Sequence, residues 1–383
     1  MAPLIIPIFL PAIGCRERCL FCNQKASSEG LVSPASVRNY VEASLSQIPY
    51  NKKNREKQVA FYGGSFTAID RDDQVRYLKE VQPFLASGLV DSIRVSTRPD
   101  ALDAEILSLL REHGVTTIEV GVQSMIDEVL SLALRGHRAD DTASATVRLK
   151  QWGFQVGHQL MIGLPGDTRD RFLQTLDRII ELEPDFVRIH PTLVLRGAPL
   201  ENLWREGRYS PLSLEETIDW LRRGVVMLEK SSTSVARIGL QPTDQLEGDF
   251  LAGPYHPALR QFVDGAIFFD MAASLLQTSQ KSGQTLFYCH PKDVSNLRGQ
   301  RNENILKLKK LFNLSDIFVN GRQELPRGYL GLQTQREEVS IHRKSLSYQE
   351  IGCGAFAEEG GQGIAVLRST WPSVPTVDIH VVR

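Results

Sequence analysis

The 383-residue sequence has no long apolar run, few cysteines and a net charge of only −1. A membrane-spanning helix needs about 20 consecutive apolar residues, and no stretch approaches that length. The first apolar segment, Leu4 to Leu10, is short and followed by proline, so we expect a strand there and no signal peptide. Near-zero net charge means that any affinity for nucleic acid must come from a local patch. Five cysteines do not make a secreted disulfide framework, so we expect a reducing, cytoplasmic location.

Three of the five cysteines, Cys15, Cys19 and Cys22, lie in one short segment with CxxxCxxC spacing, directly after this apolar run. Thiolates are the usual ligands of iron–sulfur clusters, and three of them leave one iron of a four-iron cluster open to a ligand that is not protein. An open position implies chemistry at the metal, as in three-ligand zinc sites. A structural zinc site or a disulfide is the alternative. The zinc site needs a fourth ligand, and the first histidine is His113.

Short apolar runs alternate with helical segments from Leu4 to about Val194. The expected strands are residues 4–10, 58–62, 92–96, 117–122, 155–162 and 186–194, and the expected helices are residues 34–48, 72–85, 103–113, 126–134, 139–152 and 168–182. Six strands alternating with helices predict an α/β fold with a parallel sheet and right-handed crossovers. Closed or nearly closed, this is a partial (β/α)6 barrel of the TIM type, whose sites lie at the carboxyl ends of the strands.

The cysteine segment, with Phe21 before its last Cys, resembles the signature of the radical S-adenosylmethionine (radical SAM) superfamily. The resemblance implies a 4Fe–4S cluster held by Cys15, Cys19 and Cys22, with S-adenosylmethionine chelating the open iron. One electron from the cluster would split S-adenosylmethionine into methionine and a 5′-deoxyadenosyl radical that takes a hydrogen from the substrate. We expect a reduced flavodoxin or ferredoxin-type protein as the electron donor. The cofactors carry this chemistry, and the protein supplies placement.

A glycine pair, Gly63 and Gly64, follows the second expected strand and is itself followed by Ser65. The pair resembles the glycines that bind the methionine amino group in this superfamily, although Ser65 stands where an acidic residue is common. Glycines without side chains let a ligand approach the backbone, and a tight turn is the alternative interpretation. Thr97, at the end of the third strand, is expected nearby.

Motifs at the later strand ends resemble those of the oxygen-independent coproporphyrinogen oxidases. In that family a Gln after the fourth strand and an Arg twelve residues later contact S-adenosylmethionine, and Gln123 and Arg135 match this spacing. A bidentate guanidinium suits the methionine carboxylate. The alternatives are a strand-end amide for Gln123 and a solvated helix charge for Arg135. The acidic residues that would hold the ribose are replaced by Ser96 and Gln159.

The catalytic subunit of the tRNA-modifying Elongator complex resembles this sequence more closely. The matching segments, in the same order, are residues 96–100, 121–124, 135–137, 163–166, 190–197 and 204–211, with a shared late motif at 253–258. The resemblance covers roughly residues 5 to 265. The cysteine spacing is that of the wider superfamily, and the last hundred residues contain no recognisable coenzyme A loop. We therefore do not expect acetyl transfer by the two-domain route of that enzyme.

Four polar residues after the sixth strand are candidates for contacting the substrate. Arg237 and Gln241 lie at the end of a strand that begins at Ser234, and Tyr255 and His256 open a helix expected to run to about Leu276. The alternative is that they cap loops, because the rim of any barrel is polar. We predict one domain over residues 1–280, containing the barrel and this extension.

Residues 281–383 form the second predicted domain, small and α+β, after a linker at residues 281–284. Gly299-Gln300-Arg301-Asn302 resembles the GxxG loop of KH RNA-binding domains, with Asn302 as a residue that tolerates left-handed dihedrals in place of the last Gly. Lys281 to Lys310 contains seven Lys or Arg against two acids, an excess that phosphate binding would use. The RNA-binding candidates are Arg298, Gly299, Arg301 and Lys307. A solvated basic helix on a capping domain is the alternative, and two short strands are expected within residues 364–383.

Three functions follow from these patterns. The first is radical modification of an RNA, tRNA above all, presented by the basic C-terminal domain. The second is a radical SAM enzyme that acts on a small molecule, as coproporphyrinogen oxidase does, or on a protein residue. The third is a non-catalytic protein that binds RNA or haem, which the intact three-cysteine segment argues against, because a pure binder does not need an open iron.

Overall fold

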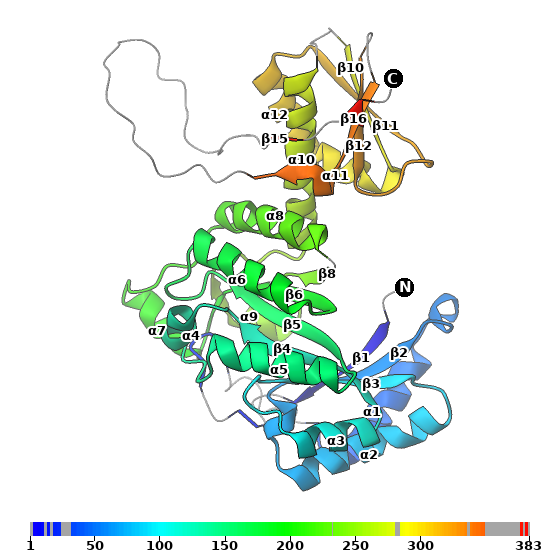
Figure 1. Ribbon diagram of the computed structural model, residues 1–383, viewed down its shortest axis with the longest axis vertical. Helices are drawn as coiled ribbons and strands as arrows, with labels where there is room; N and C mark the ends of the chain where they lie inside the picture. The colour runs from blue at the N-terminus through cyan, green and yellow to red at the C-terminus, as the bar shows by residue number, and fades with distance from the viewer. Residues whose placement is uncertain are drawn as a thin grey trace. The chain divides into compact units, whose positions relative to one another are not determined.

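The structure is a computed structural model that describes residues 3–10, 14–15, 18–23, 32–231, 233–279, 284–334, 338–348, 376–377 and 380–381 (Figure 1). Its contacts divide the chain into two compact units. We call residues 1–220 and 231–259 the barrel unit, and residues 221–230 and 260–383 the C-terminal unit. The predicted domain boundary at residue 280 stays a prediction. None of the helices in the described residues is both long and apolar enough to span a bilayer.

A sheet of seven parallel strands organises the barrel unit, in the order β1-β2-β3-β4-β5-β6-β8. The strands are β1 (Leu4–Leu10), β2 (Lys57–Gly63), β3 (Ser92–Thr97), β4 (Val115–Gln123), β5 (Gln155–Ile162), β6 (Phe186–Pro191) and β8 (Ser234–Ile238). The six predicted strands are confirmed. The sequence analysis did not count the seventh, β8, as part of the sheet.

Contacts between strands that are not neighbours show that this sheet is curled. The guanidinium Nη2 of Arg188 on β6 donates to Tyr62 Oη on β2 at 3.0 Å. In a flat sheet, four strand spacings would separate these strands by roughly 19 Å. Arg94 on β3 likewise lies 5.0 Å from the ring centre of Phe186 on β6. The predicted α/β partial barrel is therefore confirmed, with these side chains on its concave face.

Helices cover the outside of the sheet, as Figure 1 shows for α3, α5 and α6. The helices along this part of the chain are α1 (Pro34–Ser46), α2 (Arg71–Ala86), α3 (Ala104–Glu112), α4 (Asp127–Leu132), α5 (Ala139–Gln151), α6 (Arg169–Leu182), α7 (Pro199–Arg205), α8 (Leu214–Lys230) and α9 (Asp244–Asp249). Capping residues set several starts: Asp103 accepts from the Ile106 N–H before α3, and Thr168 accepts from Arg171 before α6. Two short strands, β7 (Val194–Leu195) and β9 (Phe250–Ala252), pair with each other at the carboxyl side of β6.

The C-terminal unit is built on a mixed sheet in the order β11-β10-β12-β13-β16. Its elements are α10 (Leu259–Thr278), β10 (Gln284–Cys289), α11 (Val294–Arg298), α12 (Glu303–Phe312), β11 (Asp316–Gly321), β12 (Tyr329–Gln333), β13 (Glu338–His342), β14 (Leu346–Ser347), β15 (Thr376–Val377) and β16 (His380–Val381). The predicted α+β pattern is confirmed. A linker was predicted at residues 281–284 and two strands within residues 364–383. Most of these residues lie outside the described part of the chain. The helix predicted to open at Tyr255 begins instead at Leu259, because Pro257 interrupts the turn before it.

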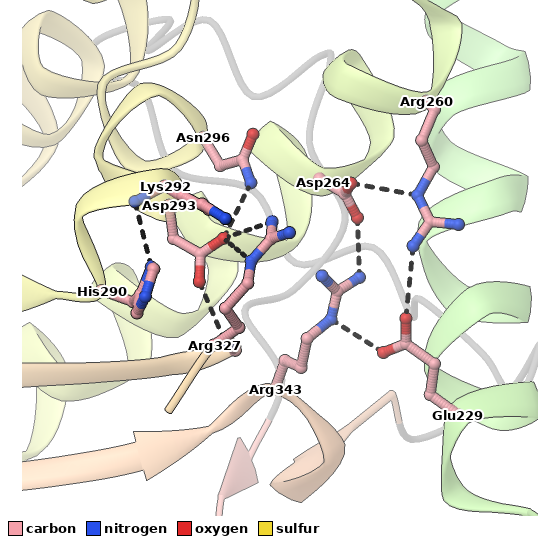
Figure 2. A network of polar contacts seen from close by, with 10 residues as sticks. Glu229, Arg260, Asp264, His290, Lys292, Asp293, Asn296, Arg327 and Arg343 are labelled. Carbon is pink, nitrogen blue, oxygen red and sulfur yellow. Dashed lines mark hydrogen bonds and ion pairs between the residues drawn. The ribbon is translucent and has the colours of Figure 1, made fainter. Parts of the chain in front are cut away.

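Ion pairs link the elements of this unit, as Figure 2 shows. Asp293 is 2% exposed and accepts from Arg327 Nη2 at 2.8 Å and from the Gly328 N–H at 3.0 Å. Arg343 lies between Glu229 and Asp264, at 2.7 and 2.8 Å (Figure 2). These buried or half-buried charges are therefore neutralised by each other.

Candidate functional site

The cysteine segment begins against the loop that follows β2. Gly14 has a φ of +75°, and a Cβ there would lie 2.3 Å from the Ser65 carbonyl oxygen. Only glycine allows this approach, which places Cys15 beside that loop. Burial raises the pKa of the Cys15 thiol, and a hydrogen bond from the Ser65 backbone partly offsets this rise. The first predicted cluster ligand thus lies beside the loop of the predicted glycine pair.

Backbone hydrogen bonds hold the second half of the segment. The Cys22 N–H donates to the Cys19 carbonyl at 3.1 Å, which forms a turn. The Leu20 N–H donates to the Ala133 carbonyl at 3.1 Å, and the Leu20 carbonyl accepts from the Leu200 N–H at 2.8 Å. The segment is therefore tied to the end of α4 on one side and to α7 on the other.

Two side chains that flank Cys22 strengthen these ties. Phe21 packs against two buried apolar clusters, one at the end of β5 and α4 and one around α7. Asn23 Nδ2 donates to the Arg196 carbonyl at 2.6 Å and to Asp249 Oδ2 at 3.1 Å. The aromatic residue of the motif therefore anchors the segment to the apolar clusters on both sides of it.

Arg135 reaches from the end of α4 into this site. It is 7% exposed, its Nη1 lies 3.1 Å from Cys19 Sγ, and its Nη2 donates to the Gly121 carbonyl at 2.5 Å. Its Nε is buried without a hydrogen-bond partner among the described residues. Burial, followed by the charges of Cys19 and Cys15, raises the pKa of Cys22 to about 11, and Arg135 opposes that rise. The Arg135 guanidinium therefore acts on both Cys15 and Cys22 and contacts Cys19.

Gln123 ends β4 in a left-handed conformation, with a φ of +69°. The pairing of β4 with β5 shifts register just before it, so a bulge turns this side chain away from the regular strand. Gln123 is 4% exposed, and its Oε1 has no hydrogen-bond partner among the described residues. A Cβ on Gly121 would lie 3.2 Å from both Gln123 Nε2 and Arg135 Nη2, so the predicted pair is brought together.

The glycine pair lies where β2 meets the end of β1. Gly63 has a φ of +109°, and a Cβ there would lie 2.8 Å from the Leu10 carbonyl, to which the Gly64 N–H donates at 2.8 Å. Ser65 Oγ lies 3.2 Å from Thr97 Oγ1, and both side chains are buried. These two predicted residues therefore join the loops that follow β2 and β3.

Two histidines near the strand ends were not singled out in the sequence. His137, just after Arg135, is buried, and neither ring nitrogen has a hydrogen-bond partner among the described residues. Burial and then the charge of Arg135 lower its pKa to about 4. His190 on β6 bonds Gln159 at 3.2 Å, one of the positions where an acid was expected. Both rings are neutral near pH 7, so they add hydrogen-bonding groups without adding charge.

A charged layer lies deeper in the barrel, and the sequence analysis missed it. Glu119, 2% exposed, accepts from Arg94 at 2.6 Å and from Tyr62 at 3.0 Å, and it pairs with Arg188 at 3.2 Å. The sequence does carry a signal for this layer: polar residues stand at alternate positions of these strands, where the strands of a parallel sheet are normally apolar throughout. Such residues share one face of the sheet, here the concave one.

The four residues predicted to contact the substrate make hydrogen bonds to residues close to them in the chain. Arg237 donates to Gln241 at 2.7 Å, Tyr255 donates to Glu247 at 3.1 Å, and His256 accepts from the Ala258 N–H at 3.0 Å. These hydrogen bonds bring Arg237 and Gln241 together and join Tyr255 to Glu247.

The four RNA candidates belong to the C-terminal unit. Gly299, Arg301 and Asn302 all have left-handed φ angles, between 48° and 67°, so Asn302 adopts the conformation expected of it. Arg298 is exposed at the end of α11, whereas Lys307 pairs with Glu303 at 2.5 Å. The loop before α12 is therefore a strongly curved turn with basic side chains beside it.

In the described part of the chain no three Cys, His, Asp or Glu side chains are gathered closely enough to hold a metal ion. The donor set at the cysteine segment nevertheless fits an iron–sulfur cluster with an amino acid ligand. Three soft thiols lie in one segment, and beside them the acceptor Gln123 Oε1 and the donor Arg135 Nε are buried without a hydrogen-bond partner among the described residues. A buried polar atom without a partner is costly unless a ligand satisfies it.

Comparison with known proteins gives two matching family models, described as the Radical SAM superfamily over residues 10–179 and the Radical_SAM C-terminal domain over residues 184–267. The chain is 25% identical over 240 residues to a tRNA uridine(34) acetyltransferase of Dehalococcoides mccartyi, covering 54% of this chain and 52% of that protein. It is 32% identical over 258 residues to Elongator complex protein 3 of Bos taurus, covering 57% and 47%. The chain thus spans about half the length of each.

Among solved structures, the archaeal Methanocaldococcus infernus Elp3 with an N-terminal deletion superposes with a TM-score of 0.57 at 22% identity. The match covers 69% of this chain and 62% of that one. At this identity it supports the fold alone.

Proposed function

Because this chain belongs to the radical SAM superfamily, whose members are enzymes that use a 4Fe–4S cluster and S-adenosylmethionine, we propose that it modifies RNA, tRNA above all, by radical chemistry. The observation that carries the proposal is Arg135, whose Nη1 lies 3.1 Å from Cys19 Sγ and whose Nε has no hydrogen-bond partner among the residues that the structure describes. The RNA part is supported by the names of the two relatives, a tRNA uridine(34) acetyltransferase and Elongator complex protein 3. Acetyl transfer is not part of the proposal.

In this proposal Cys15, Cys19 and Cys22 hold the cluster. When bound, the cluster supplies the electron that splits S-adenosylmethionine into methionine and a 5′-deoxyadenosyl radical. The ties of Leu20 to α4 and α7 keep the thiols at the carboxyl ends of the strands. A reduced flavodoxin or ferredoxin-type protein is the proposed electron donor, and the cytoplasm is the proposed location.

The proposed S-adenosylmethionine contacts surround this segment. Arg135 donates to the methionine carboxylate, since a guanidinium matches a carboxylate in charge and geometry. Gly63 and Gly64 offer backbone groups to the amino end, and Gln123 Oε1 supplies an acceptor that has no hydrogen-bond partner in the described part of the chain. Ser65 and Thr97 complete the proposed set by joining two of the loops around it.

Substrate contacts are proposed in both units. Arg237, Gln241, Tyr255 and His256 are the proposed contacts in the barrel unit, and Arg298, Gly299, Arg301 and Lys307 are the proposed RNA contacts in the C-terminal unit. The left-handed turn at residues 299–302 supports the second group, because a tightly curved loop exposes backbone N–H groups to phosphates.

The test is anaerobic reconstitution with iron and sulfide, followed by dithionite and S-adenosylmethionine with and without total cellular tRNA. We expect 5′-deoxyadenosine to form and tRNA to raise its rate several-fold. Cys19→Ala should abolish the product, whereas Cys289→Ala, which removes a buried thiol of β10, should retain it. If 5′-deoxyadenosine forms at the same rate with and without tRNA, RNA is removed from the proposal, and a small molecule or a protein residue is left as the substrate. A full cluster without any product would remove the catalytic role.

A further inference from the structure

Arg188 and Arg237 lie next to each other on the concave face of the barrel. They are register partners on the neighbouring parallel strands β6 and β8. Register partners point to the same face of a sheet, and Arg188 faces the interior, where it donates to Tyr62 across the barrel at 3.0 Å. Two guanidinium groups are therefore held side by side below the carboxyl ends of their strands.

The surroundings do not neutralise both charges. The carboxylate in this layer is Glu119, which is shared by Arg94 at 2.6 Å and Arg188 at 3.2 Å. Arg237 donates to the neutral amide of Gln241 at 2.7 Å and has no ion-pair partner among the described residues. Three guanidinium groups thus face one carboxylate, which leaves a surplus of two positive charges.

The other titratable groups of this layer cannot offset the surplus near pH 7. Burial lowers the pKa of His190 to about 4 and raises the pKa of Tyr62 to about 12, so both are neutral. Gln159, which bonds His190, is neutral as well. Burial also lowers the pKa of Arg237, followed by the like charge of Arg188, although an arginine stays protonated at pH 7. Two half-buried like charges side by side are unfavourable unless an anion lies between them.

We propose that Arg188 and Arg237 form an anion subsite inside the barrel, which binds a carboxylate or phosphate group of the substrate. The subsite deepens the proposed function, and it rests on that function for its role in catalysis. Two forked guanidinium groups match the planar oxygens of either anion. Arg188 lies three residues before the end of β6 and Arg237 one residue before the end of β8, so a bound anion would leave the rest of its molecule at the strand ends.

The experiment measures anion binding directly in the full-length, cluster-reconstituted protein. Saturating S-adenosylmethionine is present so that the carboxylate site at Arg135 is filled. Labelled inorganic phosphate and labelled acetate are the two probes in anaerobic equilibrium dialysis. We expect at least one of them to bind at least tenfold more weakly to Arg237→Gln than to the unchanged protein. Tighter binding of phosphate would indicate a phosphoryl group on the substrate, and tighter binding of acetate would indicate a carboxylate.

The control is Arg205→Gln, which removes an exposed arginine of α7 in the same unit and should leave binding unchanged. Arg237→Lys keeps the charge without the fork and should give an intermediate loss. Equal binding of both anions to Arg237→Gln and the unchanged protein would overturn the subsite. Because the readout does not depend on 5′-deoxyadenosine, loss of the subsite and loss of the tRNA proposal are separate results.

Discussion

The strand ends of the barrel unit and the interior of the C-terminal unit both bury polar groups, but they treat them differently. At the strand ends, Gln123 Oε1 and Arg135 Nε are buried without partners among the described residues. In the C-terminal unit, Asp293 accepts from Arg327 and from the Gly328 N–H (Figure 2). Buried polar groups are nearly always satisfied, so the first region calls for a ligand, whereas the carboxylate of Asp293 is satisfied within its own unit. Amino-acid composition alone does not show which buried polar groups have partners and which do not.

The largest effect expected on this comparison comes from removing the central acid of the C-terminal unit. Asp293→Ala leaves the Gly328 N–H without its acceptor and Arg327 without its counter-ion. We expect the free energy of local opening to fall by about 2 kcal/mol, less than for a fully buried pair because the Arg327 side chain is 60% exposed. Amide hydrogen exchange along β10 and β12 measures it. Glu303→Ala, which breaks an exposed pair, is the control, and an effect of equal size there would contradict the comparison.

The sequence predicted the elements of the barrel unit well, because each strand carries a local signal. The bounds of β1 and β5 match the expected ones, since both are apolar runs of ordinary strand length. The strand β8 was not placed in the sheet because only one of its five residues is fully buried. The pair β7 and β9 was missed because strands of two or three residues have no periodicity to detect.

The residues of the site can be divided in the same way, into those with a local sequence signal and those without one. The cysteine spacing and the interval from Gln123 to Arg135 are local features, and the structure brings these residues to one place. The contact of Arg188 with Tyr62 joins residues 126 positions apart and depends on how far the sheet curls. Curling is a property of the whole sheet, so the charged layer could be suspected from alternating polar residues but not paired from sequence.

A variant of Arg135 tests whether the unpartnered groups of the barrel belong to a ligand. Arg135→Gln should raise the Kd for S-adenosylmethionine about tenfold or more, because a charge-assisted hydrogen bond contributes about 1.5–3 kcal/mol. Equilibrium dialysis on the reconstituted protein measures the affinity. Arg178→Gln removes another arginine that donates to a backbone carbonyl, that of Met125, and should leave the Kd unchanged. Equal losses in the two variants would show that Arg135 acts on the fold alone.

A second carboxylate, Asp167 of the barrel unit, sharpens the contrast with Asp293. Asp167 accepts from the N–H groups of Gly163 and Thr168 at 3.0 Å, and no described cation pairs with it. Burial raises its pKa from 3.8 to about 7. The folded chain therefore binds a proton that the unfolded chain releases, so this contribution to stability is present below pH 4 and is lost as the pH rises to 7 and above.

Asp167→Asn removes this titration and keeps one of the two acceptor oxygens, so one of the N–H groups of Gly163 and Thr168 loses its acceptor at every pH. We expect the stability of the variant relative to the unchanged protein to rise by about 2 kcal/mol between pH 5 and pH 8, because only the unchanged protein loses stability over this range. Urea unfolding followed by tryptophan fluorescence measures it, since Trp152, Trp204 and Trp220 all lie in the barrel unit. Asp170→Asn, an exposed acid nearby, should show no such dependence on pH. A stability gap that does not change with pH would rule out the buried carboxylate as its cause.

The smallest effect is expected at the basic loop of the C-terminal unit, where pairing separates two candidates for RNA contact. Arg298 is exposed and has no ion-pair partner among the described residues, whereas Lys307 pairs with Glu303 at 2.5 Å. A phosphate contact by Arg298 would release one counterion. Arg298→Gln should therefore weaken tRNA binding several-fold and reduce the slope of log K against log salt concentration by about one.

Lys307→Gln should change the affinity for tRNA and the salt slope less, because the charge of Lys307 is already partly neutralised by Glu303. The Glu303 carboxylate that the variant leaves unpaired is exposed, so it repels phosphate only weakly. Binding titrations at four or more salt concentrations give both slopes. If the two variants have equal effects, the pair of Lys307 and Glu303 opens when RNA binds. This exposed pair would then differ from the pair of Asp293 and Arg327, which stays closed. If neither changes the slope, the basic loop does not contact RNA phosphates, and the difference between the two units reduces to one ligand site in the barrel.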